Sequence, residues 1–363
     1  MKKLLLLTVL LAGVVAGWSY WQLDGFRSVT PKSAGSCQMI NGVGAAADMA
    51  FNYRSGVGFM AVYDRLGVLQ ADSSQGLSSQ GGQANGDIVV LNSQQLPSSY
   101  SIKNLPGLID FKPAGISLYS ANGDSSESQG RLYVVNNRAT GQDTIEVLTL
   151  AAGNQPVFAK TLKNDLFQRA IDVAVVGYDQ FYVLTGPPPA SLLGRYKAMM
   201  GVGPKSTLLY YDRGVIKTVL DQHHFLSSVA ATADGHRVYV ADAKGRRVIN
   251  YKRDLLSGEL SYSAEVVLAA APEQIQIDGN GDLWVVGALR PLDYLRHIMS
   301  KGLKSSASEL YYIAADNDLL AEPVVKMTSL GFEQSAMSSA VKLGGQVLVG
   351  SITARNIQLC PYL

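Results

Sequence analysis

The chain has 363 residues, of which 47% are hydrophobic and 17% charged, the balance of a globular protein with a large core. Its 31 basic and 29 acidic side chains nearly cancel, so the composition provides no basic face and excludes nucleic acid as the expected partner. The length does not require a second domain, because all-β barrels and propellers commonly reach this size as one domain.

Residues 1–21 have the features of a secretory leader. Lys2 and Lys3 precede the apolar run Leu4–Ala16, and the small residues near its end permit cleavage. The run is shorter than the roughly 20 residues that a stable membrane span needs. Aromatic residues such as Trp18 follow it, however, and these are typical of a membrane interface. The sequence predicts export to a periplasmic or extracellular location and leaves open whether residues 1–21 are a cleaved signal peptide or a membrane anchor.

From residue 50 onwards the chain repeats one pattern, in which a turn residue, often glycine, precedes a short run of alternating apolar residues. A period of two after a tight turn is typical of a β-strand. The pattern occurs at Gly56–Tyr63, Gly130–Asn136, Tyr178–Leu184, Asp234–Asp242, Gly281–Val286 and Gly344–Gly350. Second strand candidates follow at Thr144–Leu150, Thr207–Tyr211 and Arg247–Tyr251. Units spaced by roughly 50 residues predict an all-β, six-bladed propeller over residues 22–363.

Two segments interrupt the strand pattern and are expected to be short helices. Pro187–Met200 begins with a run of prolines, and Leu289–Lys301 has apolar residues at helical spacing. Both mix leucine and methionine with lysine and arginine, which is typical of a membrane-surface or lid helix. The alternative is a pair of helices that cap the propeller and have no membrane role.

Cys37 and Cys360 are the two cysteines of the sequence. In an exported chain they are expected to form a disulfide bond, because exported proteins meet an oxidising compartment. The alternative is two unpaired thiols. A bond between the two ends of the chain would also close a ring of blades, whose first and last sheets otherwise leave unpaired edges.

Several motifs occur in one collinear order from about Cys37 to the C-terminus. They are Phe111–Ser117, Leu132–Asn136, Ile171–Gly177, Ala233–Ala241, Asp278–Val285, Ala307–Leu310 and Gly350–Leu363. Together with the two cysteines they resemble the paraoxonase/arylesterase family of six-bladed propellers, which is related to gluconolactonase-like and strictosidine-synthase-like propellers. The resemblance implies a calcium-dependent hydrolase of lactones or aryl esters, with one calcium ion at the base of a central tunnel. Calcium is a hard cation that prefers six to eight oxygen ligands.

Carried over residue by residue, the resemblance gives a partial ligand set for that calcium ion. The matching positions are Asp48, Ser227 (or Ser228 with a shift of one residue), Glu273 and Gln274. One further family ligand, an asparagine, falls on Ile171, which cannot bind a metal ion. Asp172 is expected either to support the ligands of this first site or to hold a second, structural calcium ion, which the resemblance implies, together with the backbone carbonyl of Ile116. Its remaining family aspartate falls on Met49, a poor ligand for a hard cation.

The catalytic residues of the family are replaced in this chain. Its two histidines fall on Ala114 and Asn137, neither of which acts as a general base near neutral pH. Glu273 and His224 are the candidates for a replacement base, since both lie in stretches that the resemblance places near the tunnel. The simpler interpretation is that both belong to an ordinary polar rim.

Two functions therefore remain open. The first is an exported hydrolase of small hydrophobic esters or lactones, with an altered calcium site. The second is a non-catalytic exported propeller that binds a ligand or a protein partner at the mouth of the tunnel. The family resemblance favours the first function, and the replacement of both histidines favours the second. Contact with a membrane surface through the two helical insertions is compatible with either.

Overall fold

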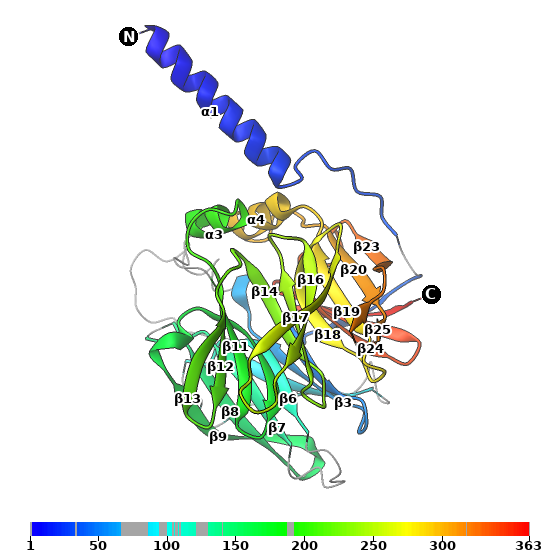
Figure 1. The fold of residues 1–363 in the computed structure, drawn as a ribbon. Coiled ribbons are helices and arrows are strands. Elements are labelled where there is room, and N and C mark those ends of the chain that lie inside the picture. The colour runs from blue at the N-terminus through cyan, green and yellow to red at the C-terminus, as the bar shows by residue number, and fades with distance from the viewer. Residues whose placement is uncertain are drawn as a thin grey trace, which may run out of the picture.

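A computed structural model describes residues 2–32, 35–66, 86–93, 100–103, 105, 108, 110–120, 130–139, 141–186, 192–316 and 318–362 (Figure 1). The strands form six four-stranded antiparallel sheets, arranged as blades around a central axis. This arrangement confirms the predicted six-bladed propeller. The innermost strands contact one another from blade to blade around the whole ring.

Each blade is built from four strands, ordered from the tunnel outwards. The first two blades are β2–β5 (Ala46–Asn52, Val57–Val62, Asp87–Asn92, Tyr100–Lys103) and β6–β9 (Pro113–Tyr119, Arg131–Asn136, Thr144–Ala151, Gln155–Lys163). The next two are β10–β13 (Ala170–Gly177, Gln180–Thr185, Thr207–Asp212, Val215–Leu220) and β14–β17 (Leu226–Ala231, Arg237–Asp242, Arg247–Arg253, Leu260–Val267). The fifth is β18, β19, β20 and β23 (Ala271–Ile277, Leu283–Ala288, Ser308–Ile313, Val324–Ser329). The sixth is β24, β25, β26 and β1 (Met337–Leu343, Gln346–Ser351, Asn356–Pro361, Gln38–Asn41).

A few short elements lie outside the blades. The hairpin β21–β22 (Ala315–Asp316 and Leu319–Leu320) is inserted in the fifth blade. Two 3-10 helices, η3 and η4, cover Ala152–Asn154 and Asp165–Phe167. They join consecutive strands.

The six repeated sequence segments are the second strands of the six blades, β3, β7, β11, β15, β19 and β25. The central residues of these strands are apolar because both of their faces are covered by neighbouring blades. In β7, for example, Leu132 and Val134 pack in the cluster shared with the first blade, whereas Tyr133 and Val135 pack against the third. Continuous burial of this kind makes the second strand of each blade easy to recognise in the sequence.

The N-terminal strand closes the ring. β1 pairs with β26 and so forms the outer edge of the last blade, with Gln38 opposite Leu359. Directly before β1, Cys37 is bonded to Cys360, which confirms the predicted disulfide. The first and last parts of the propeller are therefore joined both by backbone hydrogen bonds and by a covalent bond.

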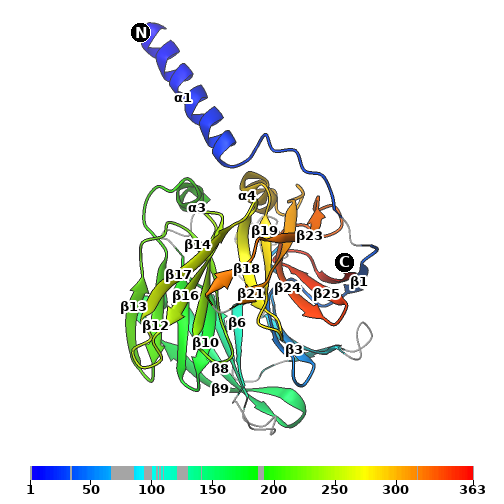
Figure 2. The ribbon, with the colours of Figure 1, turned by 45° about the vertical axis from the view of Figure 1, so that its right-hand side comes forward.

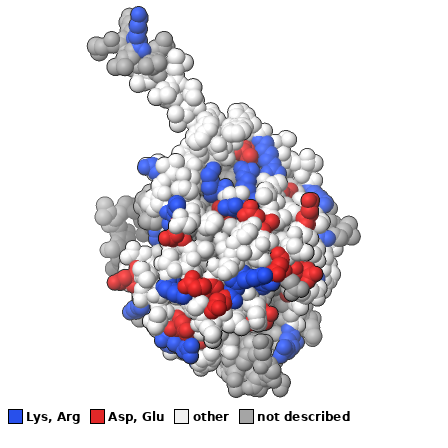
Figure 3. All heavy atoms as spheres, viewed as in Figure 1, with Lys and Arg blue, Asp and Glu red and all other residues white. Residues whose placement is uncertain are grey.

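Three helices lie at one end of the propeller: α1 (Lys2–Gln22), α3 (Leu192–Met199) and α4 (Pro291–Met299) (Figures 1 and 2). Helices α3 and α4 confirm the two helical insertions, although residues 187–191 of the first lie outside the described residues. Leu23, just after α1, is buried against Met199 and Leu295. In the part of the chain that the structure describes, no helix combines the length and the hydropathy needed to cross a membrane. Acidic and basic side chains are interspersed over the face seen in Figure 3, as the balanced composition predicts.

Candidate functional site

The innermost strand of every blade contains a β-bulge near its start, where two adjacent residues oppose a single residue of the second strand. Bulges redirect side chains and are frequent beside functional sites. The first residue of the six bulges is, in blade order, Ala47, Ala114, Ile171, Ser227, Glu273 and Ser338. The second residue is Asp48, Gly115, Asp172, Ser228, Gln274 and Ser339. The residues predicted from the sequence are therefore divided between two rings of equivalent positions.

Asp48 joins three blades through its carboxylate. The side chain is buried, and Oδ1 accepts hydrogen bonds from the N–H of Met49 at 2.7 Å and from Nε2 of Gln276 at 2.9 Å. Oδ2 accepts a hydrogen bond from the N–H of Ile116, in the second blade, at 2.8 Å. Met49 itself points into the apolar core between the first and last blades.

Asp172 makes the same kind of connection two blades further on. Oδ1 accepts from the N–H of Val173 at 2.8 Å. Oδ2 accepts from the Ser228 hydroxyl at 2.8 Å and from the N–H of Val229 at 2.9 Å, both in the fourth blade. The Gln274 amide, in the fifth blade, donates a third bond to Oδ2 at 3.3 Å. Asp172 is as completely buried as Asp48.

The two carboxylates lie close enough to affect each other's charge. Burial, and next the charge of Asp172, raise the pKa of Asp48 well above its usual range. Burial raises the pKa of Asp172 to about 6, although the hydrogen bonds from Val229 and Ser228 lower it. Gly115 permits this close approach, because a Cβ at that position would press on Asp172 Oδ1 and lie 2.5 Å from its Cα.

The carboxylate pair stands at the inner end of a large tunnel cavity. Asp172 and Gln274 line a cavity of about 1110 Å³, which extends to the turns that follow the innermost strands, such as residues 52–54, 231–234 and 277–281. The tunnel is thus hollow on the side away from the three helices.

The residues around the pair have the chemistry of a hard-cation site. Among the described residues, no group of three histidine, cysteine, aspartate or glutamate side chains converges as a complete metal site. Two carboxylates, the Ser228 hydroxyl and the amides of Gln274 and Gln276 nevertheless meet at one place, and all of them carry oxygen. Calcium accepts this mixture of carboxylate, amide and hydroxyl oxygen. The two aspartates that the resemblance divides between two calcium ions lie together here, so the residues fit one ion.

Glu273 lies in a different cavity from its neighbour Gln274. It lines a pocket of about 280 Å³ beside α3 and α4, together with the apolar side chains of Met199, Phe225 and Pro291. We call this pocket, at the starts of the innermost strands, the mouth pocket. The β18 bulge therefore places one residue in the mouth pocket and the next in the tunnel cavity.

His224 precedes Phe225 but is not among the residues that line the mouth pocket. Its Nδ1 is buried, and among the described residues no hydrogen-bond partner reaches this atom. The ring lies near Gly201, in the turn that follows α3. Of the two candidate bases, Glu273 is the one placed in a pocket.

The remaining positions taken from the family resemblance hold blades together. Ser227 donates a hydrogen bond to the carbonyl oxygen of Pro272 at 2.7 Å, in the next blade. The Asn137 amide, after β7 of the second blade, donates to the carbonyl oxygen of Ala170 in the neighbouring third blade at 2.7 Å. Ala114 and Ile171 pack against apolar clusters.

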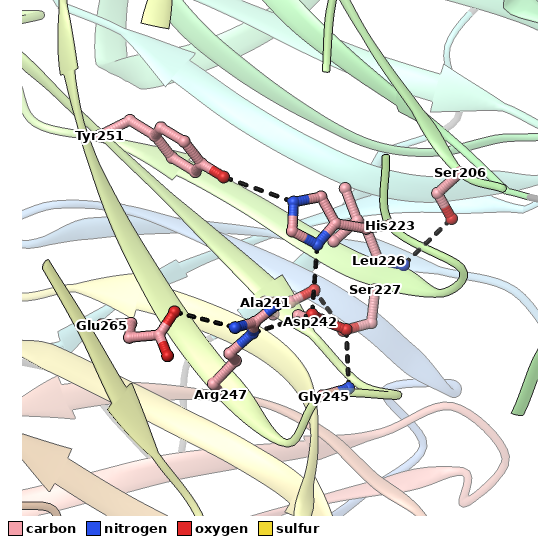
Figure 4. Close-up of polar contacts among 10 residues, drawn as sticks. All are labelled: Ser206, His223, Leu226, Ser227, Ala241, Asp242, Gly245, Arg247, Tyr251 and Glu265. Atoms are coloured by element: carbon pink, nitrogen blue, oxygen red, sulfur yellow. Dashed lines mark hydrogen bonds and ion pairs between the residues drawn. The ribbon is translucent and has the colours of Figure 1, made fainter. Parts of the chain in front are cut away.

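A polar network beside the mouth pocket was not predicted from the sequence (Figure 4). Asp242, at the end of β15, accepts from Arg247 Nε at 3.0 Å and from the N–H of Gly245 at 2.8 Å, and it contacts His223 Nδ1 at 3.2 Å. The other ring nitrogen of His223 lies 3.5 Å from the Tyr251 hydroxyl. Burial alone would raise the pKa of Asp242, but the bonds from His223, Gly245 and Arg247 lower it.

Sequence reasoning also missed Gln276, which binds Asp48. A signal for it existed, because residues two apart on a strand share one face, so Gln274 and Gln276 point the same way. The sequence does not show that this face meets a carboxylate 228 residues earlier in the chain.

Comparison with known proteins agrees with this architecture. The model of the arylesterase family matches residues 28–360. Serum paraoxonase/arylesterase 1 of Mus musculus is 22% identical over 341 residues, covering 92% of this chain and 87% of that protein. Among solved structures, the major Malassezia sympodialis allergen matches with a TM-score of 0.56 at 11% identity, covering 91% of this chain and 97% of the allergen. A putative gluconolactonase matches with a TM-score of 0.51 at 10% identity, covering 92% and 98%. The two structural matches reflect the fold, whereas the family match covers most of the sequence, and the chain belongs to the arylesterase family.

Proposed function

We propose that the protein is an exported, calcium-dependent hydrolase of lactones or aryl esters. The observation that carries this proposal is the buried pair Asp48 and Asp172, two carboxylates kept together at the centre of the propeller. Burying two like charges is costly unless a cation compensates them. The match to the arylesterase family and the oxygen-rich site around Asp48 and Asp172 both support a calcium-dependent hydrolase.

Asp48, Asp172, Ser228 and Gln274 would hold the calcium ion, with Gln274 rotating its amide so that the oxygen replaces the nitrogen. Amide oxygen and nitrogen are nearly the same size, so this rotation needs no extra space. A bound calcium ion would supply the positive charge that stabilises the oxyanion formed when an ester carbonyl is attacked.

Glu273, which directly precedes the proposed ligand Gln274, is proposed as the general base, and this role requires a substrate that reaches from the mouth pocket to the ion. Its carboxylate takes a proton from water while the water oxygen bonds to the carbonyl carbon of the ester. The bond between that carbon and the leaving oxygen then breaks, and the leaving oxygen takes the proton. The products are a carboxylic acid and an alcohol or phenol, joined in one molecule when the substrate is a lactone. The apolar side chains of the mouth pocket support a hydrophobic substrate.

Two matched variants test the role of Glu273. Glu273→Gln is expected to lower kcat for phenyl acetate and for a δ-lactone by about 10²- to 10⁴-fold, the usual contribution of a general base. His224→Gln, the control, is expected to change kcat by less than about threefold, because His224 does not line the pocket. If His224→Gln lowers kcat by this larger factor and Glu273→Gln does not, His224 is the base. If the unmutated chain hydrolyses neither substrate, the hydrolase proposal fails.

The second candidate is a non-catalytic propeller that binds its ligand at the mouth pocket. It is favoured by one observation: Asn137 stands at a position where the resemblance expects a catalytic histidine, and its amide binds the Ala170 backbone. A protein of this kind would bind hydrophobic esters without turnover, and calcium would stabilise it without activating it.

Export is supported by the basic and apolar composition of residues 2–16 and by the Cys37–Cys360 bond, which requires oxidising conditions. Exposed apolar side chains also gather at the helical end, including Trp21, Leu193 and Leu303, and support contact with a membrane surface. Mass measurement of the mature N-terminus, followed by separation of soluble and membrane fractions, would test both points. A full-length chain in the cytosol would contradict export.

A further inference from the structure

Among the described residues that line the mouth pocket, Lys244 is a cation without a partner. Lys244 lines the pocket from the turn between β15 and β16. Among the residues that the structure describes, no acidic side chain and no hydrogen-bond acceptor contacts its ammonium group. An unpaired ammonium beside apolar walls is a ready binding site for an anion.

The other charges of the pocket are accounted for. Arg246 forms an ion pair with Asp24, which also lines the pocket, and donates to the carbonyl oxygen of Ala269 at 3.3 Å. Glu273 is the other acid that lines the pocket, and it is not free of interactions either. Within the described part of the pocket, the cation available to a ligand is therefore Lys244.

The turn that carries Lys244 is held firmly in place. The N–H groups of Ala243 and Lys244 both donate to the carbonyl oxygen of Phe225, at 3.0 and 3.4 Å. Figure 4 shows the other anchor, Asp242, which accepts from the N–H of Gly245 within the same turn. Asp242 is occupied by His223 and Arg247, so it does not neutralise Lys244. A fixed backbone lowers the entropy lost when a ligand binds.

We propose that the mouth pocket binds an apolar carboxylic acid, with the carboxylate on Lys244 and the hydrocarbon part against Leu23, Met199 and Phe225. A volume of about 280 Å³ suits a small molecule. The carboxylate is assigned to Lys244 because Arg246, the other cation among the described residues of the pocket, already forms an ion pair with Asp24.

This inference depends on the proposed function in one respect: hydrolysis would be the source of the carboxylic acid. Hydrolysis of an ester or lactone releases a carboxylate, so Lys244 would retain the product and make it an inhibitor. Binding of the acid can be measured without any turnover, and the two proposals can therefore fail separately.

Calorimetric titration of the full chain with octanoate and with the neutral octanamide tests the inference. Octanoate is expected to bind more tightly than octanamide. Lys244→Gln should weaken octanoate binding by about 10-fold or more, the usual effect of losing a charged hydrogen bond, and leave octanamide unchanged. Lys244→Arg keeps the charge and should retain octanoate binding. Lys205→Gln, at an exposed lysine outside the pocket, is the control and should bind like the unmutated chain.

Equal binding of octanoate and octanamide, or of octanoate to the unmutated chain and Lys244→Gln, would overturn the inference. So would the absence of octanoate binding to the unmutated chain. Tight octanoate binding without ester or lactone turnover would leave the inference standing and contradict the hydrolase proposal. Turnover that octanoate does not inhibit would support the hydrolase proposal and contradict the inference about Lys244.

Discussion

Asp48 and Asp172 occupy the same position in their blades, two blades apart, and each is the second residue of a β-bulge. Each carboxylate accepts a hydrogen bond from the backbone of the next innermost strand, at Ile116 and Val229 respectively. The fold thus directs two acidic side chains to one place at the tunnel axis. Burial raises the pKa of both carboxyl groups, and for Asp48 the neighbouring charge of Asp172 adds to this effect.

Calcium is expected to stabilise the protein through this pair. At a calcium concentration of about 100 times Kd, the free energy of unfolding should rise by about 2.7 kcal/mol. Asp48→Asn removes one of the two charges, and the increase should disappear. The measurement is urea unfolding with calcium and with a chelator. Asp221→Asn, at an exposed aspartate, should behave like the unmutated chain, and an equal calcium effect in Asp48→Asn would refute this role for the pair.

Gly115→Ala should destabilise the propeller at the same place. A Cβ there would press on the carboxylate and backbone of Asp172, whose side chain is held by hydrogen bonds from Val173, Ser228 and Val229. Overpacking of this kind costs about 1–3 kcal/mol, and the calcium effect should also weaken. Gly345→Ala is the control, since no atom lies within 4 Å of the Cβ it would add. Equal unfolding midpoints for the two variants would contradict the prediction.

Asp278 gives the stability of the fifth blade a dependence on pH. Burial would raise its pKa, but hydrogen bonds from Lys342, the N–H of Asn280 and the Trp284 indole lower it. Because the folded pKa is the lower one, this stabilisation is complete above the unfolded value of about 3.9 and is lost as the pH falls through the folded value.

Asp278→Asn should cost about 1–3 kcal/mol at pH 7, the usual effect of removing one partner from a buried hydrogen bond. The difference between variant and unmutated chain should shrink as the pH is lowered towards 3. Urea unfolding followed by tryptophan fluorescence at several pH values measures it. A difference that stays constant, or grows with acidification, would show that the Asp278 charge is not responsible.

The Cys37–Cys360 bond should stabilise the closed ring strongly. Replacing both cysteines by serine is expected to lower the free energy of unfolding by about 2–5 kcal/mol. The pairing of β1 with β26 remains, so the variant should still fold as a propeller. The unmutated chain in a reducing agent also lacks the disulfide bond, and it should unfold at the same urea concentration as the double variant. Unfolding midpoints that do not depend on the bond would contradict its role in closure.

The sequence predicted the second strand of each blade better than the innermost one, for a physical reason. The second strands are buried on both faces and follow a tight turn, so an apolar run such as Leu132–Val135 stands out. The innermost strands carry polar residues at the tunnel, and their bulges interrupt the period of two. In Leu226–Ala231, for example, two serines stand at the bulge.

Three members of the polar cluster in the tunnel were named from the sequence, but their arrangement was not predictable. The family resemblance selected Asp48, Asp172 and Gln274, which do meet in the structure. It could not show which of two adjacent residues a bulge turns towards the tunnel, because a shift of one residue reverses the direction of a side chain. For this reason Glu273 and Gln274 were expected in one site and instead line two cavities.

The most direct test of calcium-dependent hydrolysis is the turnover of a δ-lactone by the full chain in calcium, after chelation, and after calcium is restored. We predict hydrolysis that disappears on chelation and returns with calcium, and an Asp172→Asn variant that is inactive in all three states. Hydrolysis that survives chelation, or no hydrolysis by the unmutated chain in any of the three states, would contradict the proposal that this propeller is a calcium-dependent hydrolase.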